Sequence, residues 1–108
     1  MDNDGILNVI INNCQIDYKN PYYTYSKISS RLDVIGISNK ILNLKDIFGI
    51  KNYYFMIVNF NKKYYLIDIN INGKVLELND ETFKLYLKTF EIDNNVRIEN
   101  IYSKVKSR

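Results

Sequence analysis

The spacing of apolar residues changes near residue 51. Over residues 1–50 they recur mainly at helical intervals, and over most of residues 51–103 they alternate with polar residues as in a half-buried strand. In the first segment the i, i+3, i+4, i+7 pattern predicts an amphipathic helix that starts near Asp4. The residues that carry this pattern are Leu7, Ile10, Ile11 and Cys14.

Two more helices are predicted before residue 50. Proline cannot continue a helix interior, so Pro21 predicts a loop after the first helix. Thr24 or Ser26 can then cap a second helix that stops at Gly36. A third helix is predicted over residues 38–49, which makes the first half of the chain mainly helical.

Three strands are predicted next, over residues 52–60, 63–71 and 74–79. β-Branched and aromatic residues are frequent in all of them. Asn61-Lys62 and Asn72-Gly73 have the composition of two-residue hairpin turns. These segments should therefore form an antiparallel meander.

The two turns predict the register of the sheet and the side chains on each face. They pair Val58 with Tyr65 and Ile69 with Leu76. One face is then the core, with Tyr54, Met56, Val58, Tyr65, Ile67, Ile69, Leu76 and Leu78. The opposite face is expected to expose an apolar surface, with Tyr53, Phe55, Ile57, Tyr64, Leu66 and Val75.

The last segments complete an α+β domain. Asn79-Asp80 predicts a helix through Phe90, and alternation over 96–102 predicts a C-terminal strand. Residues 104–108 read as a solvated basic tail. We therefore expect one domain over residues 1–108, with N-terminal helices followed by an antiparallel meander sheet, an inserted helix and a final strand.

Composition narrows the functional classes. The chain has 15 basic and 12 acidic residues, no histidine and one cysteine, Cys14. A lone cysteine favours a reducing compartment, and Met1-Asp2-Asn3-Asp4 lacks the features of a signal peptide, so we expect a cytoplasmic protein. The missing histidine removes the commonest general base and metal ligand. We expect a non-enzymatic protein with no cofactor, metal or small-molecule substrate.

The segment Gly36-Ile37-Ser38-Asn39-Lys40-Ile41-Leu42 resembles the staphylococcal uracil-DNA glycosylase inhibitor family. The order of predicted elements extends the resemblance over nearly the whole chain. The family is encoded with mobile cassette DNA, and its inhibitors imitate DNA on the enzyme's DNA-binding surface. The resemblance thus implies a protein partner, either uracil-DNA glycosylase or another DNA-processing enzyme. The family's acidic contact at the start of the second helix corresponds here to Tyr25-Ser26-Lys27, where the serine alone matches.

Two hypotheses about function follow. In the first, the protein is a non-enzymatic inhibitor that blocks the DNA-binding surface of an enzyme such as uracil-DNA glycosylase. The enzyme would meet Tyr22, Tyr23, Tyr25 and Ser26 at the start of the second helix, and Phe55, Ile57, Tyr64 and Leu66 would line an apolar socket on the sheet. In the second, the protein is a single-stranded nucleic-acid-binding or replication accessory protein of a mobile element. Bases would stack on the Tyr/Phe sheet face, and phosphates would be held by Lys62, Lys63, Lys74, Lys104 and Lys106. The N-terminal helix and loop could instead cover some of these sheet side chains.

Overall fold

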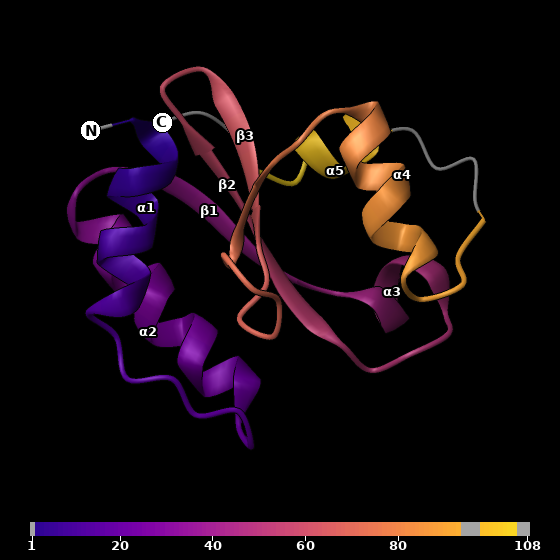
Figure 1. Cartoon of the computed structure of the whole chain (residues 1–108), viewed down its shortest axis with the longest axis horizontal. Helices are drawn as coiled ribbons and strands as arrows, with labels where there is room; N and C mark the ends of the chain where they lie inside the picture. Colours follow the sequence, from indigo (N-terminus) through magenta and orange to yellow (C-terminus); the bar gives the residue numbers. More distant parts are fainter. Residues whose placement is uncertain (1, 94–97, 106–108) are drawn as a thin grey trace.

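Helices pack on both faces of a central antiparallel sheet (Figure 1). The computed structural model describes residues 2–93 and 98–105. Within these residues the sheet has four strands in the order β1-β2-β3-β4. The elements are α1 (Asn3–Asn12), α2 (Pro21–Val34), β1 (Ser38–Asn43), α3 (Leu44–Phe48), β2 (Tyr54–Phe60), β3 (Lys63–Ile67), β4 (Val75–Glu77), α4 (Asp80–Lys88) and α5 (Ile98–Tyr102).

The mixed α+β class is confirmed, and so are the first two helices. Asp2 caps α1 by accepting a hydrogen bond from the Gly5 N–H. α2 starts earlier than predicted, because Pro21 is its first residue. Proline suits this position, since its fixed φ is helical and the first N–H of a helix has no helical partner. Thr24 therefore lies inside the helix and does not cap it.

The third predicted helix is mostly wrong. Residues Ser38–Asn43 form β1, which pairs antiparallel with β2, and only α3 remains helical before Gly49 ends it at a positive φ of 74°. Phe55 and Ile57 of β2 are fully buried, and their backbone groups point away from β3, so these groups need hydrogen-bond partners on the other side of the strand. β1 supplies those partners, and this requirement overrides the helical spacing of its apolar residues.

The turn between β2 and β3 is confirmed. Asn61 and Lys62 have φ values of 51° and 65°, as a type I′ turn requires. Phe60 pairs with Lys63 and Val58 with Tyr65, as the turn predicts.

The predicted pairing of β3 with β4 is wrong by three residues. Leu66 faces Leu76, whereas Ile69 had been expected there. An odd shift moves the side chains of a strand to the other face, so Leu76 and Leu78 lie on the same side as Leu66. The strand stops at Ile67 because the residues that follow it form a longer loop.

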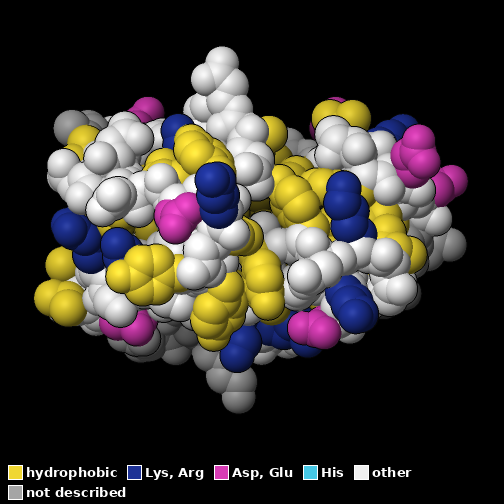
Figure 2. All heavy atoms as spheres, turned by 90° about the horizontal axis from the view of Figure 1, so that it is seen from below, with side chains coloured by type: hydrophobic (Ala, Val, Ile, Leu, Met, Phe, Trp, Pro, Cys, Tyr) yellow, Lys and Arg dark blue, Asp and Glu magenta, His cyan; other side chains and the backbone are white. Residues whose placement is uncertain are grey.

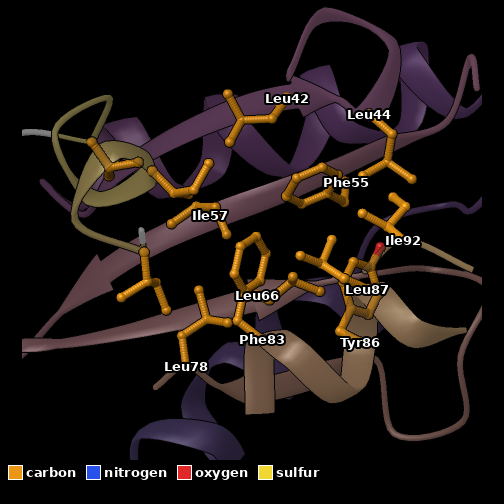
Figure 3. Close-up of a cluster of buried hydrophobic side chains, with 13 residues drawn as sticks. Leu42, Leu44, Phe55, Ile57, Leu66, Leu78, Phe83, Tyr86, Leu87 and Ile92 are labelled. Carbon is orange, nitrogen blue, oxygen red and sulfur yellow. The ribbon is translucent and has the colours of Figure 1, made fainter. Parts of the chain in front are cut away.

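Each face of the sheet carries a hydrophobic core. One core joins the sheet to α1 and α2, and the other joins it to α3, α4 and α5. Phe55, Ile57 and Leu66 are all 0% exposed, and Figure 3 shows them facing α4. The prediction of an exposed apolar sheet face is therefore wrong. The C-terminal helices cover that face, and the N-terminal helices α1 and α2 cover the other one.

The C-terminal end differs from the prediction in its last element. Asn79 and Thr82 form a capping box that starts α4 where expected. The predicted strand over 96–102 is a helix from Ile98, while Val96 lies outside the described residues. Ile98 and Ile101 are three residues apart and both buried, as a helix facing the core requires. Val105, placed in the predicted tail, is buried too, and residues 106–108 lie outside the described part.

In the described ranges no helix is both long and apolar enough to cross a membrane.

Burial of the sheet face can be tested with a charge. Leu66→Asp places a carboxylate in the core beneath α4, which should cost several kcal/mol and abolish cooperative thermal unfolding. Leu85→Asp is the matched control, because Leu85 lies on α4 but is 57% exposed. We expect the control to unfold within a few degrees of the unmodified protein by circular dichroism. Equal melting temperatures for both variants would contradict the assigned burial.

Candidate functional site

Exposed tyrosines gather where α2 begins. Tyr18, Tyr22 and Tyr23 are 59%, 53% and 51% exposed. Figure 2 looks at this end of the molecule and shows hydrophobic side chains, tyrosine included, interspersed with lysine and arginine. Together with the half-buried Tyr54, these residues are named the tyrosine surface. The exposed rings of Tyr18, Tyr22 and Tyr23 are accessible to a partner.

The helix and the loop before it fix the tyrosine surface. α2 turns Tyr25, Ile28 and Leu32 inward, which leaves Tyr22 and Tyr23 outside. The buried Thr24 side chain accepts a hydrogen bond from the Asp17 N–H at 2.9 Å and donates one to the Asp17 carbonyl at 3.2 Å. These bonds hold the loop against the first turn of α2 and thereby place Tyr18.

Tyr22 is oriented by a ring of the sheet. Its ring centre lies 5.2 Å from that of Tyr54, at an interplanar angle of 60°. Aromatic pairs favour this edge-to-face geometry, which aligns the positive edge of one ring with the negative face of the other. The contact therefore orders an exposed side chain before any partner arrives.

A hollow of about 460 Å³ separates the α2 start from the loop before β2. Its volume lies in the range of small-ligand sites. Asparagine amides in its wall offer both donors and acceptors beside the tyrosine rings. The hollow is lined by Tyr18, Asn20, Pro21, Tyr22, Asn52, Tyr53, Tyr54 and Asn70.

Lysines surround the rings. Lys27 places its ammonium group 4.4 Å from the centre of the Tyr23 ring, and Lys51 lies 5.8 Å from that of Tyr53. Lys19 and Lys27 line a neighbouring hollow of about 540 Å³ beside Tyr18. The carboxylate of Asp17 also lies here and accepts the Lys19 N–H. Among the described residues at these hollows, positive charge exceeds negative charge.

A buried carboxylate supports the wall of the first hollow. Asp68 is 1% exposed and accepts hydrogen bonds from the Tyr53 hydroxyl at 2.8 Å and the Tyr86 hydroxyl at 2.9 Å. It also accepts the Asn70 N–H at 2.8 Å. A buried charge is tolerated only with such partners. The network fixes Tyr53 and Asn70, both of which line the hollow.

The network also sets the protonation of its tyrosines. Burial, and then the hydrogen bond donated to Asp68, raise the pKa of Tyr53 to about 12. Burial, followed by the nearby Asp68 charge, raises the pKa of Tyr86 as well. A phenol must stay protonated to donate to a carboxylate. Both groups therefore remain donors at physiological pH.

The side chains of the tyrosine surface are suited to noncovalent contacts. Among the described residues no cluster of three or more His, Cys, Asp or Glu side chains could hold a metal ion. Cys14 is buried and donates to the Ile10 carbonyl at 3.4 Å. What the tyrosine surface offers to a partner is aromatic rings, amides and ammonium groups.

The residues proposed for the start of the second helix differ in their exposure. Tyr22 and Tyr23 are exposed as expected, and Ser26 is half-buried. Tyr25 is fully buried, and its hydroxyl accepts the Ile69 N–H at 3.0 Å, so the prediction of an exposed Tyr25 is wrong. This hydrogen bond joins α2 to the loop after β3.

The residues proposed for the sheet socket lie elsewhere. Phe55, Ile57 and Leu66 are inside the core, and Tyr64 is half-buried under Tyr102, with ring centres 3.8 Å apart. None of them lines the hollows at the tyrosine surface.

Sequence reasoning missed Tyr18 and Tyr54 as members of the site. The position of Tyr18 in the loop before Pro21 was a readable signal of exposure. Tyr54 could not be found this way, because it was assigned to the core face of the sheet.

Comparison of the chain with protein-family models, curated proteins and solved structures found no match.

The contact between Tyr53 and Asp68 predicts a pH dependence of stability. The pKa of Tyr53 is raised in the folded protein to about 12, above the value of about 10 in an unfolded chain. Its contribution is therefore complete below about pH 10 and is lost as the pH rises to about 12. We expect the stability difference between the unmodified protein and Tyr53→Phe to shrink over this window, as measured by urea unfolding. A difference that stays constant up to about pH 12 would contradict the assignment.

Proposed function

We propose that the protein binds single-stranded nucleic acid through the tyrosine surface. The observation that carries the proposal is the exposure of Tyr18, Tyr22 and Tyr23 beside Lys19 and Lys27. Aromatic rings stack on bases, and lysines contact phosphates, so this pairing of residue types matches both parts of a nucleotide.

Stacking contributes to the affinity without depending on the base sequence. Each base stacked on an aromatic side chain contributes about 1–3 kcal/mol. Tyr22 is already ordered by Tyr54, which lowers the entropy lost when a base stacks on it. The amides of Asn20, Asn52 and Asn70 in the hollow can hydrogen-bond the edge of an unpaired base.

A single strand fits this surface better than a duplex. Faces of bases are accessible only where the strand is unpaired and unstacked, and the tyrosine surface offers rings rather than a helix shaped for the major groove. The formal net charge of +3 supports an anionic ligand. The sequence predicted that bases stack on the sheet face. In the structure the exposed rings lie at the start of α2 instead.

Fluorescence anisotropy of a labelled oligothymidylate tests the proposal. We expect binding that weakens as salt is raised from low to moderate concentration, because phosphate contacts release counterions. Tyr22→Ser and Tyr23→Ser should each weaken binding about tenfold through lost stacking. Leu85→Ser, at a similarly exposed position on α4, is the matched control and should bind normally.

Two results would overturn this function. One is the absence of salt-sensitive binding to any single strand, and the other is an equal loss in the tyrosine variants and in Leu85→Ser. Thermal unfolding of each variant verifies that it is folded, which separates lost contacts from lost structure.

Inhibition of uracil-DNA glycosylase is the second candidate. The start of α2, where the resemblance places the inhibitor's contact, presents Tyr22 and Tyr23 to solvent. In this function the surface would meet the basic DNA-binding groove of the enzyme, and Lys27 would oppose that approach.

Lys27→Glu separates the two candidates because they predict opposite signs. If Lys27 contacts nucleic acid, reversing its charge should lower the affinity for a single strand severalfold. If Lys27 instead faces the basic groove of the enzyme, the same change should improve inhibition in a glycosylase activity assay. Near-stoichiometric inhibition without strand binding would favour the inhibitor, and Lys84→Glu on α4 controls for net charge.

A further inference from the structure

β1 presents unpaired backbone groups along one edge of the sheet. The Leu44 N–H donates to the Tyr53 carbonyl at 3.0 Å, and hydrogen-bonded pairs alternate along an antiparallel ladder. Lys40 and Leu42 therefore bond to β2, whereas Asn39 and Ile41 direct their N–H and C=O groups away from it. Within the described residues, no backbone group pairs with these outward groups.

Side chains of β1 do not cover this edge. The Asn39 amide is turned onto α2, where it donates to Asp33 at 2.8 Å and also to the Ile37 carbonyl at 3.0 Å. Ile41 packs against the core beneath α2. The outward N–H and C=O groups thus form a template for another strand.

A hollow of about 500 Å³ lies beside the edge. Leu42 and Ile47 give it an apolar lining. Lys40 and Lys104 contribute two ammonium groups to the lining, and Asp46 contributes one carboxylate. An added strand would place every second side chain on this side of the sheet. The hollow therefore offers space for such side chains and favours negative charge on them.

We propose that the β1 edge binds an extended acidic peptide segment of a protein partner as an additional strand. Main-chain hydrogen bonds to Asn39 and Ile41 supply the affinity, and the lysines beside the hollow select carboxylates. A second copy of the chain is a poor occupant. Registers that align two β1 strands bring the two Lys40 side chains opposite or next to each other, and like charges so placed repel.

Amide hydrogen exchange followed by NMR tests the proposal with two synthetic peptides. One alternates valine with glutamate, and the other alternates valine with lysine. At saturation the glutamate peptide should slow exchange at Asn39 and Ile41 about tenfold or more, while the lysine peptide should not. The amides of Lys40 and Leu42 serve as internal controls, because they already bond to β2.

Lys40→Glu adds a second arm to the test. Lys40 is exposed, so the variant should fold normally and should prefer the lysine peptide. Three results would overturn the proposal: no protection by the glutamate peptide, equal protection by both peptides, or a preference that Lys40→Glu leaves unchanged. Protection of Ile41 that grows with protein concentration alone would assign the edge to a second copy instead.

Discussion

The hydrogen bonds of Asp68 determine much of the architecture. Its carboxylate accepts a hydrogen bond from the Asn70 N–H in the loop after β3, and further hydrogen bonds from the hydroxyl groups of Tyr53 and Tyr86. A loop fixed in this way ends β3 at Ile67 and sets the pairing of Leu66 with Leu76. That register decides which apolar side chains face α4. A single buried charge is thus linked to the second core, to the attachment of α4 and to the wall of the tyrosine-lined hollow.

Burial of both sheet faces limits where the protein can meet a partner. The apolar face that a sequence reading leaves exposed is occupied by α4 and α5, so Phe55 and Ile57 serve stability. Among the described residues, the start of α2 and the edge of β1 present groups that a partner could contact. The first region offers rings and ammonium groups, and the second offers backbone hydrogen bonds. The two proposals assign the first region to a nucleic acid and the second to a peptide.

Local signals predicted the elements that depend on local chemistry. The Asn61-Lys62 turn, the capping box at Asn79 and the left-handed Gly49 were all readable, because each satisfies nearby backbone groups. β1 was not readable, since its strand form depends on pairing with β2 some fifteen residues later. Alternation over 96–102 likewise suited a strand, although contacts of Ile98 and Ile101 with the core select a helix from Ile98. In the candidate site, the loop before Pro21 indicated exposure nearby, whereas Tyr54 required the fold.

Chemical-shift mapping tests the central claim most directly. The claim is that helices cover both faces of the sheet and that nucleic acid binds at the tyrosine surface. A single-stranded oligothymidylate would be titrated into isotope-labelled protein while backbone amide signals are followed. We predict shifts concentrated at Tyr18, Tyr22 and Tyr23, with Phe55, Ile57 and Leu66 unchanged. Shifts concentrated on β2 and β3, or no shifts at all, would contradict the account.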